Sequence, residues 1–222
     1  MKTGILFFCF SVFLFACKQE NVSAPIPMGY EYFPVNIGHT IIYDFDSVFK
    51  DTKVDVNETT HFQIKEYIES VFSDNTNRPT QRIERYRRNN DTTVWTIMNV
   101  CTSTLTNTVA ERVEDNQRYI KLVFPVSLNK TWFGNSFTTQ PKWEYEYTKV
   151  NESATINGIK FDSTLTVTQI DELNLIEKNY SIEKYAKHVG LIYKEYIHLE
   201  TLPSGDITKA NVSTCKFKSY TP

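Results

Sequence analysis

The stretch that decides the fold is Trp143-Glu144-Tyr145-Glu146-Tyr147-Thr148, where aromatic rings alternate with polar side chains at every second position. Side chains of a β-strand point alternately to the two faces of a sheet, so this segment presents one aromatic face and one polar face. A helix would distribute the same residues around its axis. The segment therefore predicts a strand with one buried and one solvated face.

The same period of two recurs on both sides of this stretch, most clearly in 61–73 and 191–201. Short groups rich in Asn, Asp and Gly, such as Asn157-Gly158 and 203–206, separate the periodic segments as hairpin turns do. The segments with this signal predict strands at 39–49, 61–73, 80–88, 92–101, 106–114, 117–124, 142–150, 160–170, 177–186, 191–201 and 207–218.

Short turns between consecutive strands favour a meander of antiparallel neighbours. We therefore expect a mainly β fold, in which residues 32–222 form a single curved antiparallel meander with an aromatic concave face. A β-sandwich of two packed sheets is the alternative. A short helix fits only near 126–136, where it would plug part of the concavity.

The composition supports strands and limits the partners. The chain has 13 Tyr and 15 Phe but only seven Gly, a bias typical of pleated, half-buried surfaces. Its formal net charge of −2 argues against nucleic acid as a partner, because binding to phosphates requires an excess of Lys and Arg.

The N-terminal residues have a different character. Lys2 precedes an apolar run from Ile5 to Ala16 that is shorter than the roughly 20 residues of a membrane-spanning helix. Leu14-Phe15-Ala16-Cys17 resembles the bacterial lipobox, and this resemblance implies cleavage before Cys17 and attachment of lipid to its thiol. An uncleaved anchor helix is the alternative.

These features give the expected processing and location. We expect residues 1–16 to be a lipoprotein signal peptide, and residues 17–31 to be the lipidated Cys17 and a flexible tether. Acyl chains on Cys17 would hold the domain at a membrane without a transmembrane segment. The expected location is the cell envelope, as an outer-membrane lipoprotein that faces either the periplasm or the cell surface.

Two further segments carry a resemblance. Tyr32–Tyr43, which reads YFPVNIGHTIIY, resembles the opening motif of an uncharacterised family of Bacteroidetes envelope lipoproteins, with isoleucines where the Trp of that family is common. Tyr185–Glu195, which reads YAKHVGLIYKE, resembles a later motif, with His188 where a Gly is common. The resemblance implies a strongly curved sheet, a half-barrel similar to those of periplasmic lipoprotein carriers, and it brings no catalytic residues.

Two cysteines remain after Cys9 leaves with the signal and Cys17 is lipidated, namely Cys101 and Cys215. Disulfides persist in exported proteins, so these two residues are a candidate disulfide. Two separate buried thiols are the alternative.

Two groups of side chains are candidates for contact with a partner. The first is an arginine patch that could bind an anionic partner, made of Arg82, Arg85, Arg87 and Arg88. Its alternative is an exposed strand whose arginines pair with acidic neighbours. The second is a set of aromatic side chains that face either a ligand or the core, made of Trp132, Trp143 and Tyr145.

No catalytic constellation is visible in the sequence. There is no Gly-x-Ser-x-Gly elbow or Gly-rich phosphate loop, and the four histidines lack metal-ligand spacing, so we expect neither a metal nor a cofactor. The acidic pairs Asp44 with Asp46 and Glu144 with Glu146 each share one strand face, whereas glycosidase carboxylates face each other from different elements.

We therefore expect a non-enzymatic, membrane-anchored envelope lipoprotein that binds an apolar ligand in its concavity or carries it. One alternative is a surface module with a filled core that binds a protein or a glycan. Another is a hydrolase whose catalytic groups are distant in sequence. The expected partners are the membrane through the lipid anchor and a lipid, a glycan or an envelope protein.

Overall fold

The computed structural model describes residues 26–222, so the predicted signal peptide and Cys17 lie outside the described residues. Its single helical element is a short 3-10 helix, η1, at Tyr30–Tyr32 within these residues. The first six strands are β1 (Thr40–Asp51), β2 (Val56–Ser73), β3 (Pro79–Arg88), β4 (Thr96–Leu105), β5 (Val109–Glu114) and β6 (Gln117–Val123). The other six are β7 (Thr131–Phe133), β8 (Glu144–Ile156), β9 (Ile159–Leu173), β10 (Glu177–Ala186), β11 (Gly190–Thr201) and β12 (Ile207–Thr221).

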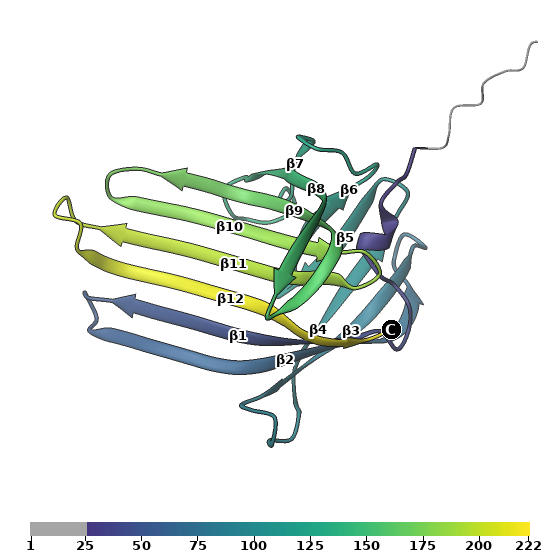
Figure 1. Ribbon diagram of the computed structural model, residues 1–222, viewed down its shortest axis with the longest axis horizontal. Coiled ribbons are helices and arrows are strands. Elements are labelled where there is room, and N and C mark those ends of the chain that lie inside the picture. The colour runs from purple at the N-terminus through teal and green to yellow at the C-terminus, as the bar shows by residue number, and fades with distance from the viewer. Residues whose placement is uncertain (1–25) are drawn as a thin grey trace, which may run out of the picture.

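All twelve strands belong to one antiparallel sheet with the order β6-β5-β4-β3-β2-β1-β12-β11-β10-β9-β8-β7. Consecutive strands are neighbours everywhere except between β6 and β7, and the first and last strands pair at the centre of the sheet (Figure 1). The central pairing runs from Thr40 opposite Thr221 to Asp51 opposite Lys209. The predicted antiparallel meander is confirmed, and a sandwich of two sheets is not found in the described residues.

The sheet curves until its two edges meet. The amide of Ile120 in the edge strand β6 donates to the carbonyl of Gly134, directly after β7, at 2.7 Å. The indole N–H of Trp132 in β7 donates to the carbonyl of Ile120 at 2.9 Å. Register shifts in several strand pairs supply the bends, since a bulge increases local twist. One large core lies where these edges meet, and it includes Ala110, Leu122, Tyr145, Tyr147, Leu165, Val167 and Tyr185.

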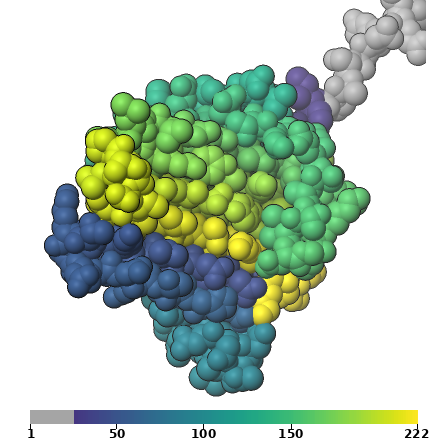
Figure 2. Space-filling view, turned by 60° about the vertical axis from the view of Figure 1, so that its left-hand side comes forward, coloured from purple at the N-terminus to yellow at the C-terminus, as the bar shows by residue number. Residues whose placement is uncertain are grey.

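The far end of the β8–β9 hairpin forms a second layer. It crosses β10, β11 and β12 in Figure 1, and in Figure 2 it is the green surface beside the yellow C-terminal strand. Ile156 of the hairpin belongs to one core cluster with Ile192 and Phe217, and Phe161 packs against this cluster. The rings of Phe161 and Phe217 meet edge to face, with centroids 5.1 Å apart. One continuous sheet thus covers part of itself.

Two details differ from the sequence-based expectations. The predicted short helix at 126–136 is wrong, because this segment forms turns and the three-residue strand β7 that pairs with β8. The predicted tether is too long, because Gly29 is buried and Met28 and Tyr30 pack against the core. No helix among residues 26–222 is long and apolar enough to cross a membrane.

Candidate functional site

The concave face of the sheet encloses a cavity of about 280 Å³. This volume is close to the lower end of the range of roughly 300 to 1,000 Å³ that is usual for small-molecule sites. Apolar side chains form part of its wall, including Phe33, Ile41, Tyr43, Phe45, Ile64, Ile68, Ile83, Val189 and Leu191. Ionisable side chains form the rest, including Glu66, Arg85, Arg112, Glu114, Asp115, Lys121, Glu183 and Lys194.

The segment Met28–Asn36 before β1, here called the N-terminal strap, is tied to loops from distant parts of the sheet. The amide of Val126 donates to the carbonyl of Met28 at 3.0 Å, and the amide of His188 donates to the carbonyl of Glu31 at 2.7 Å. These bonds fasten the strap to the connection between β6 and β7 and to the turn between β10 and β11.

The strap also supplies Phe33 and Pro34 to the cavity wall. Pro34 lies against Gly190 at the start of β11, where an added Cβ would be 3.1 Å from Cδ of Pro34. Gly190 has a φ of +93°, a backbone conformation that side chains other than glycine rarely adopt. A glycine at this position therefore permits the close approach of strap and sheet.

One cluster of charges on the wall joins β2, β3 and β5. Oε1 of Glu66 lies 3.1 Å from Nε of Arg85 and 2.5 Å from Nη2 of Arg112. Nε of Arg112 lies 2.8 Å from Oε1 of Glu114. Strand alternation explains the cluster, because Glu66 occupies the inward-facing row of β2 with Ile64 and Ile68.

A second cluster joins the edge strand β6 to β10 and β11. Nζ of Lys121 lies 2.8 Å from Oε1 of Glu183, and Nζ of Lys194 lies 3.5 Å from the same oxygen. The hydroxyl of Tyr185 donates to the other oxygen, Oε2, at 2.6 Å. The Glu183 side chain is only 1% exposed, so the pair with Lys121 is a buried ion pair across the cavity.

The buried charges hold one another in the ionised form. Burial alone would raise the pKa of Glu183, but Lys121 and Lys194 lower it to about 2. Burial likewise opposes the charge on Lys121, and the carboxylate of Glu183 raises its pKa. The pKa of Glu66 is lowered, because Arg112 and Arg85 outweigh the opposing effect of burial. The cavity therefore keeps its full set of charges near neutral pH.

Two further ionisable groups on the wall remain neutral. Burial lowers the pKa of His39, against the opposing effect of its contact with the carbonyl of Val189, which is 3.0 Å from Nε2. Burial and the nearby carboxylate of Glu66 raise the pKa of Cys215 to about 12. Neither group therefore adds a charge to the cavity at neutral pH.

Some cationic groups of the wall have unused hydrogen-bonding capacity. Nε of Arg85 and Nε of Arg112 are buried and have no hydrogen-bond partner among the described residues, although carboxylate oxygens lie within ion-pair distance. The ammonium of Lys194 has one ion pair in the described part of the chain, the 3.5 Å contact with Glu183, and its side chain is 37% exposed.

The structure does not form the predicted disulfide. Cys101 in β4 and Cys215 in β12 carry free thiols, and three strands lie between them in the sheet. Neighbouring strands are about 4.8 Å apart, so the two residues exceed the separation of about 7 Å that a disulfide spans. The alternative of two separate thiols describes the structure.

The four arginines of the predicted patch do not form one surface. Arg85 faces the cavity, and the guanidinium of Arg87 lies over the ring of Phe62 with 4.0 Å to its centroid. Arg82 and Arg88 lie on the opposite face of β3, because side chains alternate along a strand. Arg82 pairs there with Glu69 and Glu84, and Arg88 pairs with Asp91.

The three predicted ligand-facing aromatics pack in the large core and do not line the cavity. Tyr145 is 2% exposed, and Trp132 contacts its ring edge to face. Trp143 is partly buried against the same core. These residues pack where the edge strands β6 and β7 meet, a junction here called the seam, so their role in this structure is packing.

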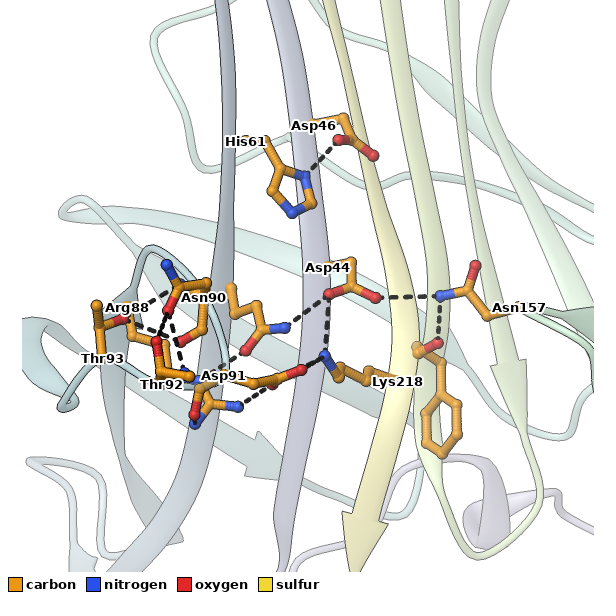
Figure 3. A network of polar contacts seen from close by, with 12 residues as sticks. Asp44, Asp46, His61, Arg88, Asn90, Asp91, Thr92, Thr93, Asn157 and Lys218 are labelled. Carbon is orange, nitrogen blue, oxygen red and sulfur yellow. Dashed lines mark hydrogen bonds and ion pairs between the residues drawn. The ribbon is translucent and has the colours of Figure 1, made fainter.

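Asp44 and Asp46, one of the predicted acidic pairs, do not line the cavity. They belong to a polar network that Figure 3 shows. Asp46 contacts Nδ1 of His61 at 2.7 Å, and Asp44 accepts a hydrogen bond from Gln63 at 3.0 Å. Lys218 bridges Asp44 and Asp91, at 3.7 Å and 2.8 Å. These contacts fasten the loop between β3 and β4 to the central strands. In residues 26–222 no three His, Cys, Asp or Glu side chains are grouped in a way that could hold a metal ion.

Sequence reasoning missed the charged wall of the cavity. The signal was a charged residue within an apolar row, as in the inward series Ile64, Glu66, Ile68 of β2 and the pair Ile83, Arg85 of β3. Such a residue is buried with the row and requires an opposite charge nearby. The identity of that partner depends on which strands meet across the cavity.

No protein-family model and no curated protein matches the chain. Two solved structures are similar to it over 86% of its length and 98% of their own. One is a "putative lipoprotein" from Parabacteroides distasonis, with 12% sequence identity and a TM-score of 0.46. The other is a "putative exported protein with YmcC-like fold" from Bacteroides fragilis, with 10% identity and a TM-score of 0.41.

Proposed function

We propose that the protein is a membrane-anchored envelope lipoprotein that binds a small molecule in its interior cavity and does not transform it. The cavity of about 280 Å³ is the observation that carries the proposal. Ligand sites are typically concave and mostly apolar, with a few polar groups that fix orientation, and this wall combines both kinds of side chain. The lipobox-like sequence before Cys17 supports the anchor.

The electrostatics of the wall favour binding over catalysis. A general acid or base works best with a pKa near the operating pH. Here the pKa of Glu183 is lowered to about 2 and that of Cys215 is raised to about 12, so both shifts lead away from neutrality. Each charged carboxylate of the two clusters also has a cationic partner within 3.1 Å. These groups are suited to holding a ligand.

The proposal is tested by comparing the native protein with a variant whose cavity is filled. Ser213 lines the cavity, so Ser213→Phe should occupy it, whereas Thr214→Phe places the same ring on the opposite face of β12. Molecules released on denaturation would be identified by mass spectrometry, and a fluorescent acyl probe would be titrated into all three proteins. We expect a released molecule and saturable probe binding in the native protein and in Thr214→Phe, and neither in Ser213→Phe.

Two results would contradict the proposal. If all three proteins release the same molecules and none binds the probe, the interior is not a ligand site, and a surface interaction with a protein or glycan becomes the better explanation. Turnover of an ester or polysaccharide that is lost on one side-chain substitution would show an enzyme.

A further inference from the structure

If the cavity binds a small molecule, as proposed above, its wall also selects the chemical class of that molecule. Ile41, Ile64 and Leu191 belong to the apolar part, while Arg85 and Lys194 belong to the charged part. A wholly apolar ligand would displace water from these charged groups without offering them a hydrogen bond, and burying polar groups in this way is costly. A wholly polar ligand would leave the apolar part in contact with water. The ligand that fits both parts is amphipathic.

The charges of the two clusters do not balance. Their carboxylates are Glu66, Glu114 and Glu183, and their cations are Arg85, Arg112, Lys121 and Lys194. The fourth carboxylate of the wall belongs to Asp115, an exposed turn residue that solvent screens. The two clusters, three carboxylates against four cations, therefore have one cation in excess, and an anionic group on the ligand would balance it.

Lys194 is the cation with capacity for that group. Glu183, its partner at 3.5 Å, is already held by Lys121 at 2.8 Å and by the hydroxyl of Tyr185 at 2.6 Å. The side chain of Lys194 is 37% exposed, whereas that of Lys121 is 6% exposed. A ligand could therefore reach the ammonium of Lys194 without displacing the buried ion pair.

The excess of one positive charge in the two clusters favours some anionic groups over others. A phosphate monoester carries about −1.5 to −2 charges at neutral pH and would leave negative charge uncompensated. A carboxylate carries one charge, which matches the single excess cation. Ammonium groups form strong charge-assisted hydrogen bonds with carboxylates.

We propose that the cavity binds a singly charged amphipathic carboxylate, with its carboxylate on Lys194 and its apolar body against Ile41, Ile64 and Leu191. This inference rests on the proposed function, because it names the ligand class of the same cavity.

Three probes with the same eight-carbon body test the inference: octanoate, octanol and octylammonium. Each would be titrated by calorimetry into the full-length protein in lipid nanodiscs, with empty nanodiscs as the blank. We expect octanoate to bind at least about tenfold more tightly than octanol, equivalent to about 1.4 kcal/mol. Lys194→Met should remove this difference. Lys184→Met is the control, because Lys184 lies over the ring of Tyr193 and does not line the cavity.

The outcomes separate the two proposals. Equal binding of octanol and octanoate, tighter binding of octylammonium, or an unchanged preference in Lys194→Met would overturn the carboxylate inference, while saturable binding itself would still support a ligand cavity. Absence of saturable binding for all three probes, together with no molecule released from the native protein, would contradict the proposed function as well.

Discussion

The hydroxyl of Tyr147 forms two hydrogen bonds with one residue, Val123. It accepts a bond from the amide of Val123 at 2.8 Å and donates one to the carbonyl of Val123 at 2.9 Å. Val123 ends the edge strand β6, so the phenol in β8 takes the place of a neighbouring strand there. Trp132 and Gly134 bond to Ile120 of β6, and Tyr147 extends this line of hydrogen bonds along β6 to Val123.

Removal of this hydroxyl should weaken the seam. Tyr147→Phe leaves a buried amide and a buried carbonyl without partners, and each such loss costs about 1–3 kcal/mol. We expect the free energy of unfolding in urea to fall by about 2–4 kcal/mol. Tyr145→Phe is the matched control, because Tyr145 is 2% exposed, against 0% for Tyr147, and its hydroxyl forms no hydrogen bond within residues 26–222. Equal losses in both variants would contradict the role assigned to the hydroxyl.

The buried pair of Lys121 and Glu183 should show strong coupling. Glu183→Gln leaves the ammonium of Lys121 buried without its counter-ion, and breaking such a pair costs about 3–5 kcal/mol. Replacing both residues, as in Lys121→Met with Glu183→Leu, removes the unpaired charge and should recover most of that loss. Urea unfolding of Lys121→Met, Glu183→Leu and the variant that combines them measures the coupling. Additive losses would show that the two groups act independently.

The same carboxylate should make stability depend on acid pH. The pKa of Glu183 is about 2 in the folded protein, against 4.5 for an ordinary glutamate. A lowered pKa stabilises the folded state above the unfolded pKa, and this stabilisation is lost as pH falls from about 4.5 toward about 2. Urea midpoints across this window should fall less steeply for Glu183→Gln than for the native protein. The exposed Glu172→Gln should retain the native slope.

The two thiols should be unreactive but free. Burial raises the pKa of both, to about 12 for Cys215, so little thiolate exists at neutral pH. In protein comprising residues 26–222, a thiol reagent should modify two cysteines rapidly in denaturant and slowly in the folded state. A mass two hydrogens lower, with no reactive thiol after unfolding without reductant, would show that the disulfide forms after all.

Gly134 should tolerate no side chain. A Cβ at this position would lie 2.0 Å from the ring of Tyr145, which the seam fixes in place. We expect Gly134→Ala to destabilise the protein by about 3 kcal/mol, the upper part of the usual range for overpacking. Gly158→Ala meets no atom within 4 Å and should cost about 1 kcal/mol through its positive φ alone. Thermal unfolding of both variants provides the comparison.

Local sequence determined much of the sheet. The alternation in Trp143, Tyr145 and Tyr147 predicted the inner row of β8, which Tyr145 and Tyr147 form, with Trp143 directly before the strand. Asn157-Gly158 marked the turn that follows β8. The strand β7 was missed because three residues carry no periodic signal, and its pairing with β8 depends on where the edge of the sheet arrives.

The residues of the cavity wall could not be predicted from local sequence patterns. Glu66 and Arg112 are 46 residues apart and meet only because β2 and β5 curve around one cavity. The sequence indicated aromatic rings as ligand contacts, but Trp132 and Tyr145 serve the seam, and charged residues line the cavity with the aliphatic ones. Whether an inward-facing side chain packs in the core or lines the cavity depends on the curvature of the whole sheet.

The pairing of β1 with β12 has a consequence for the order of folding in time. During synthesis β1 emerges before the other strands, yet one of its two neighbours in the sheet, β12, is the last strand to appear. Such distant pairings make folding slow, because the chain loses the entropy of closing a long loop before the stabilising contacts between its ends can form. Until then, β1 has an unpaired edge at what becomes the middle of the sheet, and unpaired edges invite aggregation. A circular permutant opened between β6 and β7, with the present termini joined, would turn this slowest contact into a local hairpin.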